Sequence, residues 1–181
     1  ISVMGSFQSE ARPLNDHTLS SRIKNAGDLN RDGLDDFVLA RAESDAGADN
    51  GGAVYVFLSS DGAYGPAPAQ SFLGVNREDE LGRSIEVVDL NGDGLKDLMY
   101  GVRLADGNGV NSGALMIHLG QPDGLFGEEP SMIIDGPQND AQFGMSVAIC
   151  DFNGDDYLDI AVGAYAYEDR NVQPQHYNQG A

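Results

Sequence analysis

The residues best placed to do chemistry are acidic and amide side chains that recur at one spacing in three short loops. In each loop, side-chain oxygens occupy positions 1, 3, 5 and 9, and the backbone carbonyl of position 7 can add another oxygen. The candidate ligands are Asp28, Asn30, Asp32, Leu34 and Asp36; Asp89, Asn91, Asp93, Leu95 and Asp97; and Asp151, Asn153, Asp155, Tyr157 and Asp159. Alternate spacing lets a tight loop aim several oxygens at one centre, and oxygen ligands without His or Cys select Ca²⁺ over zinc or copper. The sequence therefore predicts about three calcium ions per chain.

The sixth position of each loop needs a backbone that turns sharply. Gly33 and Gly94 supply that turn, whereas the third loop has Asp156 there. Asp tolerates a left-handed conformation better than most residues but at a higher cost than Gly. We therefore expect the third site to have a lower affinity or a changed shape. An EF-hand is excluded because position 12 of each loop lacks its Glu and because strand-like sequences flank the loops. The alternative is a set of solvated acidic turns that bind no metal.

The loops belong to a longer repeat. They begin at Asp28, Asp89 and Asp151, which are 61 and 62 residues apart. A short apolar run precedes each loop, opening at Leu19-Ser20, Leu81-Gly82 and Phe143-Gly144. Strand-like segments follow at 52–57 and 113–118, and again at 70–73 and 131–134. Each unit is thus about four short strands, which is typical of a propeller blade, and no amphipathic helical run competes with this interpretation.

Composition limits the function classes. The chain has 181 residues and a formal net charge of −19, which suits a single domain and disfavours nucleic acid or anionic lipid as a partner. No apolar stretch is long enough for a membrane helix, and the first residues do not resemble an export signal. If the protein is exported, we expect its signal to lie upstream or to have been removed. The single cysteine, Cys150, lies in an apolar run, and we expect it to be buried as a small hydrophobic residue.

On these residues the sequence resembles the FG-GAP repeat of integrin α-subunit propellers and their bacterial relatives. The opening Phe-Gly of that family appears at Phe143-Gly144, as Leu81-Gly82 and, weakly, as Leu19-Ser20, and its acidic loop is matched three times. The resemblance implies a propeller of about seven blades, with calcium loops between the first and second strands of a blade. It implies that ligands and partner subunits engage the opposite face. The absence of paired cysteines looks more like a bacterial exported member.

The predicted fold is therefore all-β, a single propeller segment over residues 1–181. Its repeats are expected at approximately 19–75, 81–135 and 143–181, and residues 1–7 are expected to form a strand that pairs with a neighbouring or terminal blade. About three blades are too few for an ordinary ring. Either the segment is part of a larger ring, with further blades in cis, or the ring closes in trans by self-assembly as a homo-oligomer.

The connections opposite the acidic loops are predicted at 41–52, 103–113 and 165–179. The first two are rich in Gly, Asp and Asn and are interpreted as plain loops. The third is the candidate ligand surface, because exposed aromatic and charged side chains suit protein or sugar contacts. Its candidate ligand-binding residues are Tyr165, Tyr167, Arg170, His176 and Tyr177.

No catalytic motif accompanies these features, so we expect a binding protein rather than an enzyme. The leading hypothesis is a secreted or cell-surface module, extracellular in either case, for adhesion or recognition of a protein or glycan ligand, with calcium in a structural role. Two alternatives stay open. One is the propeller of a secreted carbohydrate-active or phospholipase-type enzyme, and the other is a purely structural self-assembling scaffold.

Overall fold

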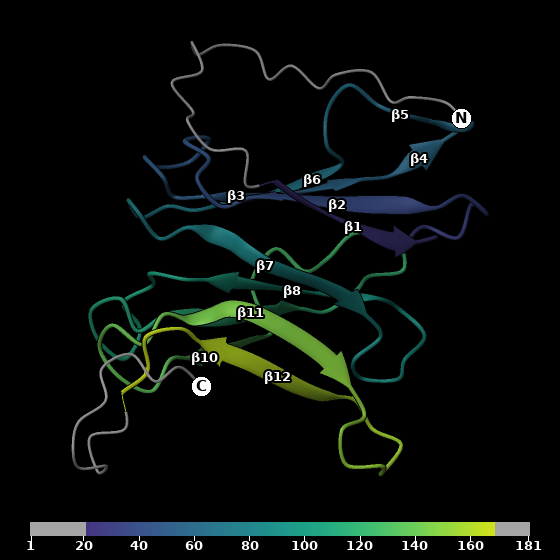
Figure 1. Ribbon diagram of the computed structural model, residues 1–181. Coiled ribbons are helices and arrows are strands. Elements are labelled where there is room, and N and C mark those ends of the chain that lie inside the picture. The colour runs from purple at the N-terminus through teal and green to yellow at the C-terminus, as the bar shows by residue number, and fades with distance from the viewer. Residues whose placement is uncertain (1–20, 169–181) are drawn as a thin grey trace.

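The computed structural model describes residues 21–168, and within them all regular structure is β (Figure 1). The strands are β1 (Ser21–Gly27), β2 (Asp36–Arg41), β3 (Ala53–Phe57), β4 (Ser59–Ser60), β5 (Ala63–Tyr64), β6 (Gln70–Leu73), β7 (Leu81–Val88), β8 (Asp97–Val102), β9 (Ala114–His118), β10 (Met132–Asp135), β11 (Phe143–Cys150) and β12 (Asp159–Ala164). No helix in this part of the chain is long and apolar enough to cross a membrane.

Two complete blades and the first half of a third follow one another along the chain. Blade 1 is an antiparallel sheet in the order β1-β2-β3-β6, blade 2 has the order β7-β8-β9-β10, and the described part of blade 3 is the pair β11-β12. The short β4–β5 hairpin is an addition within blade 1. Figure 1 shows the sheets stacked face to face, which confirms the predicted all-β blades. Residues 1–7, the Leu19-Ser20 opening and the end of the third repeat lie outside the described residues.

Alternation along the strands explains the two cores. Val38, Ala40, Val54 and Val56 project from blade 1 and pack against one face of blade 2, where Leu98 is fully buried. Side chains from the other face of blade 2 pack against blade 3. The blade 2 residues are Met99, Leu115 and Ile117, and the blade 3 residues are Val147, Ile149, Ile160 and Val162. Because β8 lies between two layers, every one of its residues is buried. This double burial is why the residues of β8 after Asp97 are uncharged.

Glycines allow the blades to approach closely. Gly144, at the start of β11, has a φ of 87°, and a Cβ at this position would lie 2.4 Å from the carbonyl oxygen of Ala114. It would also lie 3.1 Å from the Cα of Gly101 in β8. Isolated parallel bridges, Gly52 to Leu81 and Gly113 to Phe143, join each blade to the next. The Phe-Gly opening is thus a blade-to-blade contact as well as a strand start.

The prediction that Cys150 is buried is wrong. Its side chain is exposed, as are Ser146 and Ala148 on the same face of β11. Alternation turns Val147 and Ile149 towards blade 2, so the remaining face of the strand points away from the described core. An apolar stretch alone does not tell which face of its strand is covered.

Candidate metal centre and the opposite face

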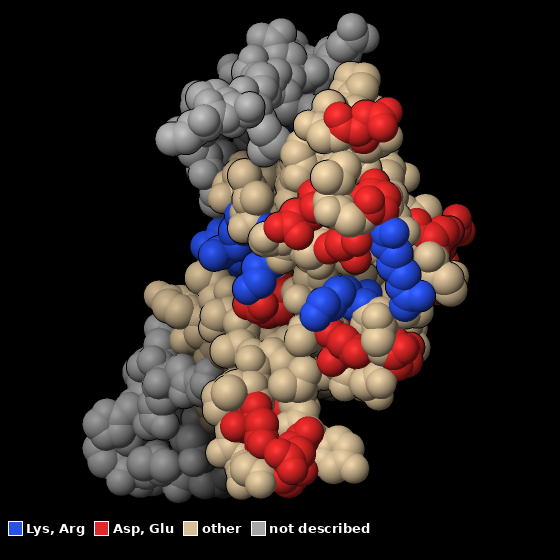
Figure 2. Space-filling model, turned by 90° about the vertical axis from the view of Figure 1, so that its right-hand side faces the viewer, with Lys and Arg blue, Asp and Glu red and all other residues tan. Residues whose placement is uncertain are grey.

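The three acidic loops lie at one end of the molecule. Residues 28–35, 89–96 and 151–158 connect the first to the second strand of each blade, on the right in Figure 1. Figure 2 looks onto this end and shows Asp and Glu side chains in separate patches, with Lys and Arg between some of them. The predicted position of the loops, between the first two strands of every blade, matches the structure.

Each loop is closed by hydrogen bonds from its own backbone. The Asp28 carboxylate accepts the N–H groups of Asp32 at 2.9 Å and Gly33 at 2.8 Å, and Asp89 and Asp151 accept the corresponding amides of their loops. The position-3 amide adds a second closure. In the second loop, Asn91 Oδ1 accepts the N–H of Asp93 at 2.9 Å, and Asn91 Nδ2 donates to the Asp93 carboxylate at 2.9 Å.

The position-9 carboxylates play a further structural part. Asp36 and Asp97 are almost completely buried, with 1% and 0% of their surface exposed. Asp36 accepts the N–H of Leu29 at 2.7 Å and that of Ser59, just after β3, at 2.8 Å. Asp97 does the same with Leu90 at 2.9 Å and Gly120 at 2.9 Å. Each of these residues therefore ties its acidic loop to the end of the third strand.

Two positions of every loop have a left-handed backbone. At position 6, Gly33 and Gly94 have φ of 86° and 83°, and Asp156 has φ of 67°. The third loop thus keeps the turn, and the Asp156 N–H still donates to the Asp151 carboxylate at 3.0 Å. Sequence reasoning missed position 4, where Arg31 has φ of 64° while Gly92 and Gly154 occupy the other loops. The recurring Gly at that position was the available signal.

The loop carboxylates point towards backbone amides rather than a common centre. Within residues 21–168, no group of three or more His, Cys, Asp or Glu side chains is arranged to hold a metal ion. The donor set nevertheless fits a hard cation, because it consists of oxygens on a tight turn and all of these side chains except Asp36 and Asp97 are at least partly exposed. Amides of Gly154 and then Asp156 hold the pKa of Asp151 below its ordinary value, so this carboxylate is charged at neutral pH.

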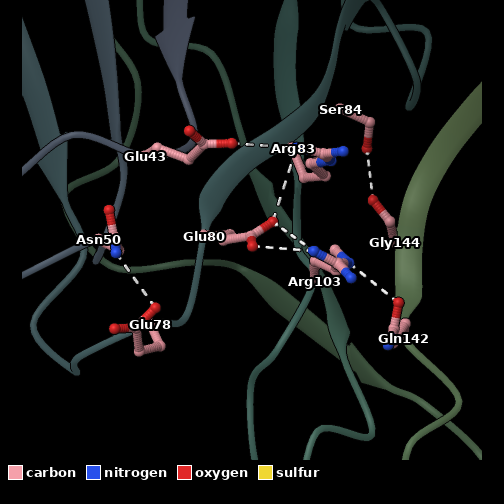
Figure 3. Close-up of polar contacts among 9 residues, drawn as sticks. All are labelled: Glu43, Asn50, Glu78, Glu80, Arg83, Ser84, Arg103, Gln142 and Gly144. Atoms are coloured by element: carbon pink, nitrogen blue, oxygen red, sulfur yellow. Dashed lines mark hydrogen bonds and ion pairs between the residues drawn. The ribbon is translucent and has the colours of Figure 1, made fainter. Parts of the chain in front are cut away.

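The opposite end contains a network that joins successive blades (Figure 3). Arg103 donates to both oxygens of Glu80 at 2.8 and 2.9 Å and to Gln142 at 2.9 Å. Arg83 lies 3.8 Å from Glu43 and 3.6 Å from Glu80, and its buried Nε has no hydrogen-bond partner among the described residues. Blade 1 and blade 2 therefore meet through charged side chains at this rim.

The same rim repeats an Asn contact. Asn50 Nδ2 donates to Glu78 at 3.2 Å, and Asn111 Nδ2 donates to Asp140 at 3.1 Å. Each of these Asn residues also donates its backbone N–H to an Asp five positions earlier, at 2.9 and 2.8 Å respectively. The connections 41–52 and 103–113 are therefore ordered ties to the following blade, not the plain loops that the sequence suggested.

Two family models match the sequence. The FG-GAP-like repeat model matches residues 28–100, and the FG-GAP repeat model matches residues 143–181. The chain is an FG-GAP repeat protein. These matches cover blade 1 from its acidic loop onwards, β7 and most of β8 in blade 2, and the whole of the described third blade.

Integrin α-subunits are among the similar proteins. Integrin alpha-5 of Xenopus laevis is 32% identical over 154 residues, which is 79% of this chain and 14% of the relative. Integrin alpha-8 of Gallus gallus is 34% identical over 139 residues, 73% of this chain and 13% of the relative. Integrin alpha-3 of Mus musculus is 39% identical over 86 residues, 46% of this chain and 8% of the relative. The chain thus spans no more than 14% of these relatives.

The predicted ligand surface of the FG-GAP segment is described only in part. Tyr165 follows β12 and is 61% exposed, and Tyr167 is half-buried. Arg170, His176 and Tyr177 lie outside the described residues. The two tyrosines are at the expected end of blade 3.

The FG-GAP blades also form an open groove of about 380 Å³ along their inner strands. It is lined by Arg22 and Lys24 of β1, Ser84 and Glu86 of β7, and Met145 of β11, among others. Lys24 forms an ion pair with Glu86, which links blade 1 to blade 2 across this groove.

His118, which has no catalytic motif around it, is a core residue. Its ring is 1% exposed; Nε2 lies 2.9 Å from the Tyr100 hydroxyl and Nδ1 lies 2.7 Å from the Gly127 carbonyl oxygen. The Phe72 ring of blade 1 lies 4.4 Å away. Burial lowers the pKa of His118 and raises the pKa of Tyr100, so both are neutral at physiological pH.

Proposed function

We propose that this chain is a calcium-binding, integrin-like propeller module for recognition or adhesion outside the cell. The observation that carries the proposal is the recurrence of one oxygen-ligand pattern in three loops at the same end of consecutive FG-GAP blades. Binding rather than catalysis is proposed, because the acids that recur in the repeat belong to the loops and to contacts between blades.

Calcium would bind side-chain oxygens that in this structure accept hydrogen bonds from backbone N–H groups. The exposed carboxylates at positions 1 and 5 and the amide oxygen at position 3 would turn inwards, and the position-7 carbonyl would join them. Asp36 and Asp97 keep free lone pairs beside the two amides that each holds, so they can add a ligand without leaving their anchors. Three ions of charge +2 would bring the formal charge from −19 to −13.

The bound ion would stabilise the folded chain. The chain has a single cysteine, so no internal disulfide constrains it, and metal binding contributes directly to folding free energy. Exposed sites of this kind bind calcium at about 10⁻⁴–10⁻³ M, which suits an extracellular setting.

The opposite end would carry recognition. There, Tyr165 and Tyr167 with Arg170, His176 and Tyr177 are proposed to contact a protein or glycan, since exposed aromatic and charged residues dominate such interfaces. Further blades, in cis or in another copy of the chain, are proposed as the other partners. A purely structural scaffold is the second candidate, favoured by the outward face of β11 with its exposed Ser146 and Ala148.

Calcium titration of chelator-treated protein by calorimetry tests the proposal. We expect about three ions per chain and a higher melting temperature with calcium. Asp32→Asn, Asp93→Asn and Asp155→Asn should each remove about one ion. Asp61→Asn is the matched control, because it makes the same charge change on the β4–β5 hairpin outside the loops. Absence of binding, with a melt indifferent to calcium, would contradict the proposal.

Light scattering separates the two candidates. A stable multimer that binds no protein or glycan would favour the scaffold. A chain that binds a protein or glycan when calcium is present, and releases it when chelator is added, would favour recognition.

A further inference from the structure

The sequence contains four Asn-Gly pairs, at 50–51, 91–92, 108–109 and 153–154, and the structure places them in two different environments. Two of them are positions 3 and 4 of the second and third acidic loops. The other two lie in the connections at the opposite end. Asn-Gly is the dipeptide in which the following backbone nitrogen is least hindered from attacking the side-chain amide, since Gly has no side chain.

In the second loop, two hydrogen bonds around Asn91 would favour that attack. The N–H of Gly92 donates to Asp89 Oδ1 at 2.7 Å, and the carboxylate makes this nitrogen more electron-rich. The N–H of Asp93 donates to Asn91 Oδ1 at 2.9 Å, where negative charge would develop during the attack. Asn91 and Gly92 are both exposed, so solvent reaches them.

The third loop repeats the arrangement. The N–H of Gly154 donates to Asp151 Oδ1 at 2.6 Å, and the N–H of Asp155 donates to Asn153 Oδ1 at 2.9 Å. The first loop differs at the residue that would supply the attacking nitrogen. Asn30 also receives the N–H of Asp32, at 3.1 Å, but the residue after it is Arg31, whose side chain hinders the nitrogen.

The two Asn-Gly pairs at the opposite end are held differently. Gly51 is buried, and its N–H donates to the Ala48 carbonyl at 2.9 Å, while the Asn50 amide donates across to Glu78. The Asn108 amide donates to the Gly136 carbonyl at 3.2 Å. These two amides are tied to other segments of the chain, at Glu78 and Gly136, which restrains their side chains from turning towards the next backbone nitrogen. The amides of Asn91 and Asn153 also donate, but to carboxylates of their own exposed loops.

We propose that Asn91 and Asn153 are sites of spontaneous deamidation, a covalent modification directed by the acidic loops. The Gly nitrogen forms a bond to the Asn side-chain carbonyl carbon and loses its proton to solvent base. The side-chain nitrogen takes a proton and leaves as ammonia, and a succinimide ring remains. Water then opens the ring at one carbonyl or the other, which gives Asp or isoaspartate.

Either product changes the loop. Asp at position 3 adds a carboxylate to the three already present at positions 1, 5 and 9. Isoaspartate adds a methylene to the backbone inside a turn whose positions 4 and 6 are fixed by the hydrogen bonds to position 1. The modification would therefore alter the second and third loops while the first stays intact.

Peptide mapping by mass spectrometry tests this on the unmodified full chain. The protein is treated with chelator and incubated in mildly alkaline buffer, once folded and once in denaturant. In the folded chain we expect Asn91 and Asn153 to react about tenfold faster than Asn50 and Asn108, because the hydrogen bonds of the loop assist the attack. In denaturant the four rates should converge. Equal rates in the folded chain, or faster reaction at Asn50 or Asn108, would overturn the proposal.

A variant pair adds a second test. Arg31→Gly should bring Asn30 to a rate near that of Asn91, and Arg31→Ala should not, since it keeps a side chain on the attacking residue. No gain with Arg31→Gly would overturn the role assigned to the loop. Repeating the incubation with added calcium rests on the proposed function, and its outcome is independent of the deamidation result. Added calcium should slow Asn91 and Asn153, because coordination would hold their side chains as ligands and would draw the position-1 carboxylate away from the Gly nitrogen. Unchanged rates would contradict calcium binding while leaving the deamidation result in place.

Discussion

Arg31 holds a backbone conformation that glycine adopts at lower cost. Its φ is 64°. The equivalent residues, Gly92 and Gly154, lie in open space, where a Cβ atom would have no neighbour within 4 Å. For a residue with a side chain, a left-handed conformation costs about 1–2 kcal/mol, so the first loop stores strain that the second loop avoids.

Replacing Arg31 by Gly should therefore stabilise the protein. The relief of strain exceeds the entropy that Gly adds to the unfolded chain, and we expect a net gain of about 0.5 kcal/mol. Urea denaturation measures it. Arg31→Ala is the control, because it removes the guanidinium but keeps a Cβ. Equal gains from both variants would show that charge, not backbone strain, was responsible.

His118 makes folding stability depend on pH. Burial lowers its pKa, so the unfolded chain binds the proton more tightly than the folded chain does. The contribution of the neutral His118 to the free energy of unfolding is therefore complete above the ordinary His pKa of about 6.5. Between that pH and the lowered pKa of the folded chain, it falls by about 1.4 kcal/mol for each pH unit.

Substitution His118→Gln should remove this component. Gln can still donate to Gly127 and accept from Tyr100, so the contacts of the ring are partly kept. We expect the free energy of unfolding to fall less steeply between pH 7 and 5 than in the unchanged protein, as measured by urea denaturation across that range. Parallel slopes in the two proteins would rule out His118 as the titrating group.

At the scale of elements, the seam between blades depends on the approach of β11 to β8 and β9. Gly144 meets backbone atoms of Ala114 and Gly101, and Ser84 Oγ donates to the Gly144 carbonyl at 2.8 Å. Backbone cannot move aside as a flexible side chain can. A side chain at this position must therefore push the two blades apart.

Gly144→Ala should destabilise the protein by about 2–4 kcal/mol, because it combines a left-handed backbone with overpacking. Gly154→Ala is the matched control: its φ of 80° is similar, but nothing lies within 4 Å of the added methyl. The control should lose only about 1 kcal/mol. Thermal or urea denaturation gives both values, and equal losses would mean that the seam tolerates the methyl.

Strands and their order followed from the sequence because alternation and period are local. Predicted strands at 52–57, 70–73 and 113–118 correspond to β3, β6 and β9, and the segment at 131–134 starts one residue before β10. The burial of Asp36 and Asp97 did not follow, since their partners, the amides of Ser59 and Gly120, are 23 residues away in each case. Contacts of that kind depend on how the third strand ends, which spacing within the loop does not encode.

At the scale of the whole molecule, the repeat identified the FG-GAP blades, but the faces that the blades present had to come from the structure. Cys150 was misplaced because a propeller strand is covered on both sides only between two blades, as β8 is. The polar ties of Asn50 and Asn111 were also missed. Their residue types are common in turns, and only the neighbouring blade shows what they hold.

The self-closed acidic loop has a consequence for the order of events. Because backbone amides already hold the turn in shape, an arriving ion would find a folded cradle and would need only to exchange a few hydrogen bonds for coordination. Little chain entropy would be lost when the ion binds, so ion binding would be fast. Differences in affinity between ions would then lie mostly in their dissociation rates. If the loops bind calcium as proposed, a blade built in this way would bind and release ions reversibly as their concentration changes, without unfolding.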